Sequence, residues 1–182
     1  MSVRIRPEEL ADRRASVEVE RAAFGSDQEP GIVEAVRDEE GSFALVAEDE
    51  GDVVGHLQFS RAWAGDVPVL ALGPIGVLPS RQGSGIGSAL MRAGIEEARE
   101  HEEAAVVLLG DPAFYRRFGF EPGIMFGLPN PFAGMTLPGG ILVVEENFLL
   151  ALLDDRAPSL AGPIRWHPAL ANPPVEGADP AT

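Results

Sequence analysis

The feature that most constrains this chain is a glycine-rich loop between an apolar segment and an amphipathic helix. Residues 67–78 (VPVLALGPIGVL) predict a long strand with a bend or bulge at its Gly-Pro step. Residues 79–87 (PSRQGSGIG) form the polar loop, and the pattern over 86–101 predicts a helix with one apolar face. The apolar run 104–109 (AAVVLL) then predicts a strand that is covered on both faces.

The start of this helix predicts an anion-binding site. The first N–H groups of a helix have no intrahelical acceptor, and the helix dipole adds partial positive charge there. Glycine at 83, 85 and 87 removes the Cβ atoms that would keep an oxygen-rich ligand away from the backbone. We therefore expect the loop amides, with Arg81 nearby, to bind a phosphate group. A turn that only reverses the chain is the simpler alternative.

A dinucleotide-binding fold is a rival interpretation of the same loop. Gly83-x-Gly85-x-x-Ser88 partly matches its fingerprint, and Asp111 follows at a suitable distance. However, in that fold the strand runs almost directly into the first glycine, whereas residues 79–82 intervene here. The fingerprint also normally opens its domain, but a helical segment and an apparent hairpin precede it in this chain.

Composition narrows the chemistry that is available. The chain has no cysteine, which excludes disulfides, thiolate metal sites and an acyl-cysteine intermediate, and its three histidines make a metal centre unexpected. The net charge of −15 argues against binding to nucleic acid or to anionic membranes, and no apolar run reaches the roughly 20 residues of a membrane span. The first ten residues lack an apolar signal region, so we expect a cytoplasmic protein.

The length of 182 residues predicts one domain. We expect this domain to span 1–171, with a core over 1–122 and an extension of the sheet over 123–171. Residues 172–182 are rich in proline and small residues, which predicts a disordered tail. Within the extension, 141–145 is typical of a strand, and 148–153 fits a strand or a helix.

The first 60 residues predict a strand, two helices and a hairpin. Residues 2–6 alternate as a half-buried strand does, and the segments 42–48 and 53–60 flank a turn as hairpin strands. A helix is expected after Pro7 and a second, shorter one around 32–36. Near-helical spacing supports the first of these helices and is shown by four residues: Leu10, Val17, Arg21 and Phe24.

Two motifs resemble those of the GNAT N-acetyltransferase superfamily. Residues 77–87 (VLPSRQGSGIG) resemble its acetyl-CoA loop, in which Gln or Arg is followed by two residues, Gly, one residue, and Gly or Ala. Gln82, Gly85 and Gly87 occupy these positions. Residues 114–120 (FYRRFGF) resemble the family's F-Y-x-x-x-G-F segment, and 162–168 (GPIRWHP) is similar to a bacterial branch of predicted N-acetyltransferases.

The resemblance implies an α+β GNAT acyl-CoA N-acyltransferase fold, with a mixed, mostly antiparallel sheet and helices on both faces. It implies direct transfer of an acetyl group from acetyl-CoA, the co-substrate, to a primary amine of a small molecule or peptide within a ternary complex. A homodimer is compatible with this interpretation. A non-catalytic acyl-CoA-binding sensor or interaction module is the alternative. Leu108 stands where many members carry an asparagine, so contacts of that side chain cannot be transferred.

The resemblance also assigns cofactor contacts. The pyrophosphate of CoA would lie on the N–H groups of residues 83–88, and a backbone N–H within 75–77, on a bulged strand, would polarise the thioester carbonyl. The expected cofactor-binding residues are Ile75, Gly76, Val77, Gln82, Gly83, Ser84, Gly85, Ile86, Gly87 and Ser88.

Tyr115, the chain's single tyrosine, occupies the family's matching position for the group that protonates the leaving thiolate. A phenol can do this as a weak acid, although packing against Phe114 and Phe118 is an alternative role. The attacking amine must also lose a proton. His56 and Glu29 are candidate bases, but a hairpin histidine with an ordinary partner and a solvated loop carboxylate are the simpler explanations.

The two tryptophans, Trp63 and Trp166, are candidates for shaping an acceptor pocket. Core packing is the simpler explanation for both.

Overall fold

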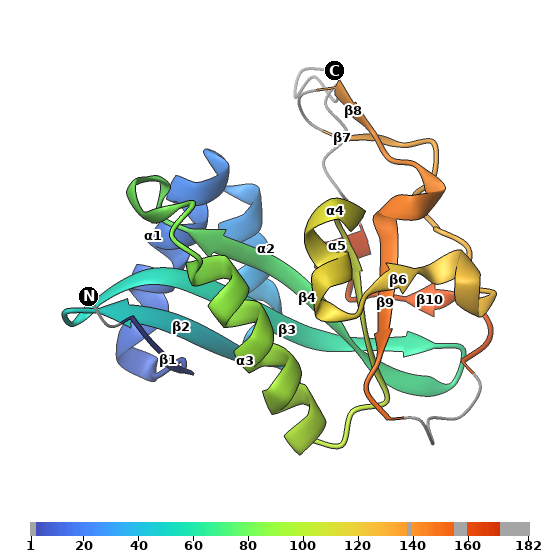
Figure 1. Ribbon diagram of the computed structural model, residues 1–182, viewed down its shortest axis with the longest axis horizontal. Helices are drawn as coiled ribbons and strands as arrows, with labels where there is room; N and C mark the ends of the chain where they lie inside the picture. Colours follow the sequence, from blue (N-terminus) through green and yellow to red (C-terminus); the bar gives the residue numbers. More distant parts are fainter. Residues whose placement is uncertain (1–2, 138–139, 155–159, 172–182) are drawn as a thin grey trace.

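The computed structural model describes residues 3–137, 140–154 and 160–171 (Figure 1). The predicted tail 172–182 lies outside these described residues. The strands of the main sheet, in spatial order, are β1 (Arg4–Pro7), β2 (Phe43–Asp49), β3 (Asp52–Ala64), β4 (Val67–Val77), β5 (Ala105–Leu109), β9 (Phe148–Leu152) and β6 (Glu121–Pro122), with β10 (Ile164–Arg165) paired to β3. A separate pair consists of β7 (Thr136–Leu137) and β8 (Ile141–Leu142).

The helices lie on both faces of this sheet (Figure 1). The α-helices are α1 (Arg13–Phe24), α2 (Gln28–Val36), α3 (Ile86–Glu100), α4 (Pro112–Tyr115) and α5 (Pro168–Ala171). Short 3₁₀ turns are η1 (Leu10–Asp12), η2 (Pro79–Arg81), η3 (Arg116–Phe118), η4 (Gly123–Phe126) and η6 (Glu145–Asn147).

Strand pairing confirms the predicted α+β class. The pair β4–β5 is parallel, and the other pairs recorded among the described strands are antiparallel. A sheet of this kind is not the parallel sheet of a dinucleotide-binding fold, so that rival interpretation is wrong. One apolar core lies between α3 and the sheet, where Leu90 and Met91 of α3 meet Leu57 and Phe59 of β3.

Strand β4 separates from β5 partway along its length. It pairs with β3 from Val67 to Val77, but with β5 only at Leu70 and Ala71. The register with β3 shifts between the partners of Leu57 and Phe59, at the predicted interruption by Gly73-Pro74. Beyond Ala71, the edge of β4 that faced β5 is therefore open to a ligand.

The two faces of β4 meet different helices. Gly55, the cross-strand partner of Val77, faces α3, because a Cβ on it would lie 3.0 Å from Leu90 Cδ1. Gly76 pairs with His56 and faces α1, where a Cβ would lie 3.2 Å from the Cβ of Ala23. Alternation along the strand thus directs Ile75 and Val77 toward α3 and residue 76 toward α1.

Of the four residues at near-helical spacing in the first helical segment, only Val17 is buried. Leu10 lies in η1 and is 78% exposed, and Phe24 is 48% exposed. The buried residues of α1 are Ser16, Val17, Val19 and Glu20. Two of these are polar, so the apolar pattern does not mark the face that is buried.

In the C-terminal half, the structure decides between strand and helix for one segment and shows that another expected strand is shorter. The segment 148–153, which fitted a strand or a helix, contains β9, which pairs with β5. The strand expected over 141–145 is limited to Ile141–Leu142. Both elements follow the short β6, which also pairs with β9.

Candidate active site

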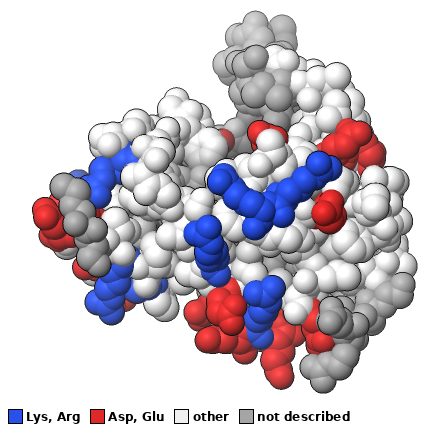
Figure 2. All heavy atoms as spheres, viewed as in Figure 1, with Lys and Arg blue, Asp and Glu red and all other residues white. Residues whose placement is uncertain are grey.

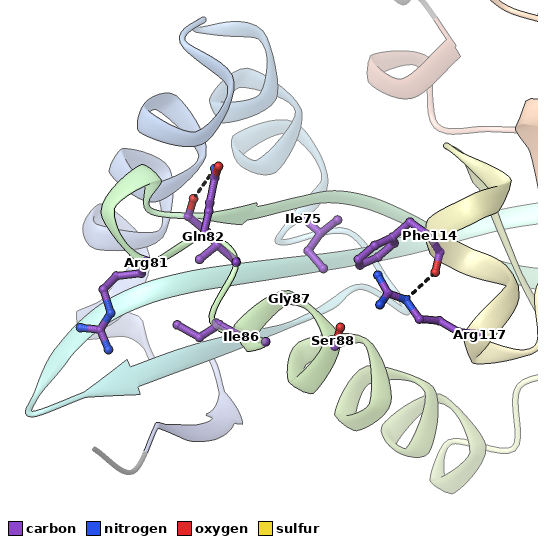
Figure 3. Close-up of a pocket in the computed structure, with 11 residues that line it drawn as sticks. Ile75, Arg81, Gln82, Ile86, Gly87, Ser88, Phe114 and Arg117 are labelled. Carbon is purple, nitrogen blue, oxygen red and sulfur yellow. Dashed lines mark hydrogen bonds between the residues drawn. The ribbon is translucent and has the colours of Figure 1, made fainter.

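A cavity of about 390 Å³ lies between the open edge of β4 and the start of α3 (Figure 3). It is lined by Ile75, Val77, Arg81, Gln82, Gly83, Gly85, Ile86, Gly87, Ser88, Phe114 and Arg117. The lining therefore comes from a strand, the glycine-rich loop, the first turn of a helix, and the segment after β5.

The loop owes its shape to two glycines. Gly83 and Gly85 have φ values of +73° and +88°, in the left-handed region that glycine adopts without strain. A Cβ on either would meet no atom within 4 Å. Glycine is therefore required at these two positions by the backbone conformation and not by packing. The side chain of Gln82 anchors the loop to β4, since its Nε2 donates to the Val77 carbonyl at 3.0 Å.

The first turn of α3 carries N–H groups that have no partner within the helix. Gly85 is the N-cap without a side-chain cap, and the Ala89 N–H makes the first recorded bond of the helix, to the Gly85 carbonyl at 3.0 Å. The amides of Ile86, Gly87 and Ser88 are therefore free to bind a ligand, and the helix dipole makes that ligand an anion.

Eight of the ten predicted cofactor-binding residues line the cavity. The other two do not: Gly76 faces α1 on the opposite side of β4, and the Ser84 hydroxyl donates to the Arg81 carbonyl. Phe114 lines the cavity together with Arg117, a residue that the sequence did not single out. No motif position marks Arg117, because its place depends on how α4 and η3 pack.

The arginines around the cavity differ in their partners. Arg81 forms an ion pair with Asp49 and points away from the other labelled side chains (Figure 3). The Arg117 Nε donates to the Phe114 carbonyl at 2.9 Å, and its guanidinium lies 4.3 Å from the Phe114 ring centroid. The guanidinium groups of Arg92 and Arg117 both lie over Phe118, at 5.7 and 5.3 Å.

Neither Arg92 nor Arg117 has a carboxylate partner among the described residues. Figure 2 shows basic side chains gathered over the α4–η3 segment and over α3. On a chain with a net charge of −15, this pair supplies uncompensated positive charge beside the cavity.

Tyr115 lies behind the wall of the cavity and is not part of its lining. Its ring contacts Phe114 and Phe120, with centroid distances of 4.9 and 5.8 Å, and it lies where a Cβ on Gly110 would be. Burial raises the pKa of Tyr115 to about 12. The phenol therefore keeps its proton across the neutral range.

His56, one of the two candidate bases, is paired with a residue that the sequence did not reveal. His56 Nδ1 lies 2.7 Å from Oε1 of Glu20, and both side chains are fully buried. Burial raises the pKa of Glu20 to about 9, with a further contribution from the charge of Glu29, and burial lowers the pKa of His56 to about 4. The sequence signal that could have found Glu20 is its place, as a carboxylate, on the helix face that packs against the sheet.

The tryptophans do not line the cavity. Trp63 is 38% exposed, and the Arg165 guanidinium lies 5.9 Å from its ring centroid. Trp166 packs against Phe132 and Phe148 at 5.9 Å each. Core packing explains Trp166, whereas Trp63 lies at the surface and outside the core.

Among the described residues, no group of histidine, aspartate and glutamate side chains is arranged to hold a metal ion. No helix in the described part of the chain is both long and apolar enough to cross a membrane.

The model of the acetyltransferase (GNAT) family matches residues 8–120, which include both motifs and the whole cavity lining. The chain belongs to the GNAT acetyltransferase family, and is thus an acyltransferase whose co-substrate is acetyl-CoA. The predicted family and fold are confirmed.

Among proteins of this family, the chain is similar to the uncharacterized N-acetyltransferase YhbS of Escherichia coli, with 40% identity over 153 residues, 81% of this chain and 86% of that protein. The match to the uncharacterized N-acetyltransferase YjhQ of Escherichia coli is 40% identical over 112 residues, 58% of this chain and 62% of YjhQ.

Two solved structures have the same fold with the cofactor bound. The structure of YhbS from Escherichia coli in complex with CoA gives a TM-score of 0.79 at 31% identity, over 93% of this chain and 92% of that one. A GNAT family acetyltransferase from Brucella melitensis in complex with acetyl-CoA gives 0.73 at 32% identity, over 92% and 97%.

Proposed function

We propose that this chain transfers an acetyl group from acetyl-CoA directly to a primary amine while both substrates are bound in one ternary complex. The observation that carries the proposal is the cavity between the unpaired edge of β4 and the free first turn of α3. The chain has no cysteine that could hold the acetyl group between two half-reactions, which favours direct attack by the amine.

The pyrophosphate of CoA is placed on the backbone amides of residues 83–88. The left-handed glycines Gly83 and Gly85 let the chain approach the phosphate oxygens, and the α3 dipole favours their charge. Arg92 and Arg117 offer a second contact to the phosphates of the cofactor, because their charges are not neutralised by neighbouring carboxylates. Local attraction of this kind offsets the acidic surface of the molecule.

The acetyl group is placed beside residues 75–77. Beyond Ala71, β4 has no β5 partner, so its N–H groups on that edge are available to the thioester oxygen. An N–H held in position by the sheet stabilises the negative charge that develops on this oxygen as the tetrahedral intermediate forms. Gln82 fixes the end of the segment through the Val77 carbonyl.

Tyr115 is proposed as the general acid that protonates the thiolate of CoA when the C–S bond breaks. Its support is its position beside Phe114, a lining residue, and a buried phenol that remains protonated at neutral pH. A thiol has a pKa of about 8.5, so the phenol is a weak acid toward the thiolate and gives up its proton only as the bond breaks.

Release of free CoA tests this function. The purified protein is incubated with acetyl-CoA and a panel of primary amines (polyamines, aminoglycosides and peptides with a free N-terminus), and free thiol is measured. We expect thiol release that depends on the amine and an acetylated product of the expected mass. Acetyl-CoA binding without thiol release for any amine would instead identify a cofactor-binding module.

A further inference from the structure

A buried row of ionisable side chains lies on the face of β4 opposite the cavity. Glu20 of α1 is hydrogen-bonded to His56 of β3, with 2.7 Å between Oε1 and Nδ1. On the other side of the imidazole ring, Nε2 lies 3.7 Å from Oε1 of Glu8, whose side chain is 7% exposed. The histidine is thus placed between two carboxyl groups, away from water.

Three atoms in this row are buried without a hydrogen-bond partner: Oε1 of Glu8, Oε2 of Glu20 and Nε2 of His56. Leaving such atoms unpaired costs stability, and a functional role is one reason for a protein to retain them. The other charged groups around the pair are Glu29 of α2, which acts on Glu20, and Arg37 after α2, which opposes positive charge on His56.

The free oxygen of Glu20 lies against the strand segment that we assign to the thioester. A Cβ on Gly76 would lie 2.5 Å from Oε2 of Glu20, so the missing side chain at 76 leaves room for this carboxyl group. Gly76 lies between Ile75 and Val77, which line the cofactor cavity on the other face. Only the main chain of β4 separates the proton-binding pair from that cavity.

Glu29 is a carboxylate of α2 that acts electrostatically on this pair. It belongs to the first turn of α2, is half-buried, and accepts a hydrogen bond from the Ser26 hydroxyl. Its negative charge acts on Glu20. Glu29 is thus a partly exposed carboxylate whose charge acts on the buried pair.

We propose that the Glu20–His56 pair is the proton acceptor of the transfer reaction, and that Glu29 passes the proton of the acceptor ammonium to it. The proposal rests on the proposed function, because it assigns the base of the same site. In this scheme Glu29 takes the proton from the amine, and Glu20 and His56, which act through Glu29, are positioning residues.

The protons of the reaction balance in the following way. A primary ammonium loses one N–H proton to Glu29 and then to Glu20, and its lone pair forms the C–N bond at the thioester carbon. The C–S bond breaks when the tetrahedral intermediate collapses, and the thiolate gains a proton from Tyr115. The second proton that the nitrogen loses replaces the one that Tyr115 gave. The proton on Glu20 returns to solvent, so one proton is released for each acetyl group.

The raised proton affinity of Glu20 suits this task. Burial raises the pKa of Glu20 to about 9, close to the value of about 10.4 for an alkylammonium. A base with a pKa near that of the acid it deprotonates transfers protons efficiently.

The test compares Glu20→Gln with Glu18→Gln, a control on the exposed side of the same helix. Glutamine can still hydrogen-bond to His56 but cannot take up a proton. We expect Glu20→Gln to fold and to bind CoA with unchanged Kd, to lose roughly 10²-fold in kcat, and to lose the rise of kcat between pH 7 and 9 that wild type and Glu18→Gln show. Glu29→Gln should lose the same rise.

Two results would overturn the proposal while the proposed function stands. One is a Glu20→Gln variant as fast as wild type; the other is a slower variant whose pH profile has the wild-type shape, which indicates a structural role only. If the wild type acetylates none of the amines, the proposal is tested by a measurement that does not need turnover. Nitrogen-15 spectra of His56 should then shift between pH 7 and 10 as Glu20 ionises, and spectra without a shift would also contradict the proposal.

Discussion

Strand β4 presents a cavity on one face and a closed polar cluster on the other. Toward α3, Ile75 and Val77 line a cavity in which the available polar groups are mainly backbone amides of the loop and helix. Toward α1, Gly76 meets Glu20, whose carboxyl group is hidden from water together with His56. One face is thus suited to binding and the other to proton transfer, and a single glycine separates them.

The difference explains why the two faces tolerate change differently. Backbone amides do not depend on the side chains of the loop, so the open face fails only when a bulky or negative group enters it. The closed face depends on two buried groups whose partners lie far apart in the chain. Substitutions can therefore disturb each face separately.

The largest effect is expected on the open face. Gly85→Glu places a carboxylate where the pyrophosphate is proposed to bind, and we expect CoA binding to be lost in calorimetry. Gly51→Glu is the matched control, because Gly51 also has a positive φ, +93°, and open space around its Cβ, but lies in the turn between β2 and β3. If both variants bind CoA equally, the loop is not the phosphate site.

Tyr115→Phe removes the proposed acid and keeps the aromatic packing with Phe114 and Phe120. We expect kcat to fall by roughly 10²–10⁴ while the Kd for CoA stays nearly constant. The measurement is steady-state kinetics with an amine from the panel. An unchanged kcat would show that Tyr115 is not the acid and only packs against its neighbours.

Gly76→Ala tests whether the closed face takes part in the reaction. The new Cβ would lie 2.5 Å from Oε2 of Glu20 and would displace it. We expect kcat to fall by about 10- to 100-fold, since small displacements of catalytic groups have effects of this size, with little change in CoA affinity. Gly31→Ala, on α2 with open space around it, is the control. Equal kinetics for the two variants would show that the contact between Gly76 and Glu20 has no part in catalysis.

Arg117→Gln removes positive charge beside the open face. We expect the Kd for CoA to rise about tenfold, the weakening of a charge-assisted contact worth about 1.4 kcal/mol. Calorimetry with CoA and with dephospho-CoA then shows which phosphate is bound. Loss for CoA alone assigns the 3′-phosphate, whereas equal loss assigns the pyrophosphate. Unchanged affinity for both would show that Arg117 binds neither.

The closed face also imposes a pH dependence on the stability of the fold. Burial raises the pKa of Glu20 from 4.5 to about 9. Its contribution to the free energy of unfolding is therefore full below pH 4.5 and is lost as the pH rises toward 9. His56 has its pKa lowered from 6.5 to about 4, so its contribution is present above 6.5 and is lost as the pH falls toward 4.

Melting temperatures between pH 7 and 9.5 check this sign. Wild type should lose stability over this range, and Glu20→Gln should lose less, because its amide does not titrate. Glu18→Gln should follow wild type, since Glu18 is exposed. Parallel curves for wild type and Glu20→Gln would mean that Glu20 is already ionised at pH 7.

The sequence predicted the open face better than the closed one, for a physical reason. The loop 79–87 is determined locally, because its glycines, the helix that follows and the apolar strand before it are consecutive in the sequence, within residues 67–101. The interruption in β4 was equally predictable, since the Gly73-Pro74 step marks it in the sequence itself.

The closed face depends on contacts between distant residues. Glu20 and His56 are 36 positions apart, and no local pattern pairs them. Buried polar residues such as Ser16 and Glu20 also interrupt the apolar periodicity of α1, so apolar spacing does not show which face of this helix is buried. The run 148–153 was ambiguous because it is apolar throughout and shows neither helical nor strand alternation.

The most direct test of the central claim is a crystal structure of this protein with acetyl-CoA. We predict that pyrophosphate oxygens lie within hydrogen-bond distance of the amides of residues 83–88, and that the thioester oxygen lies beside the open edge of β4 at 75–77. A cofactor bound elsewhere, with the loop amides free, would contradict the claim.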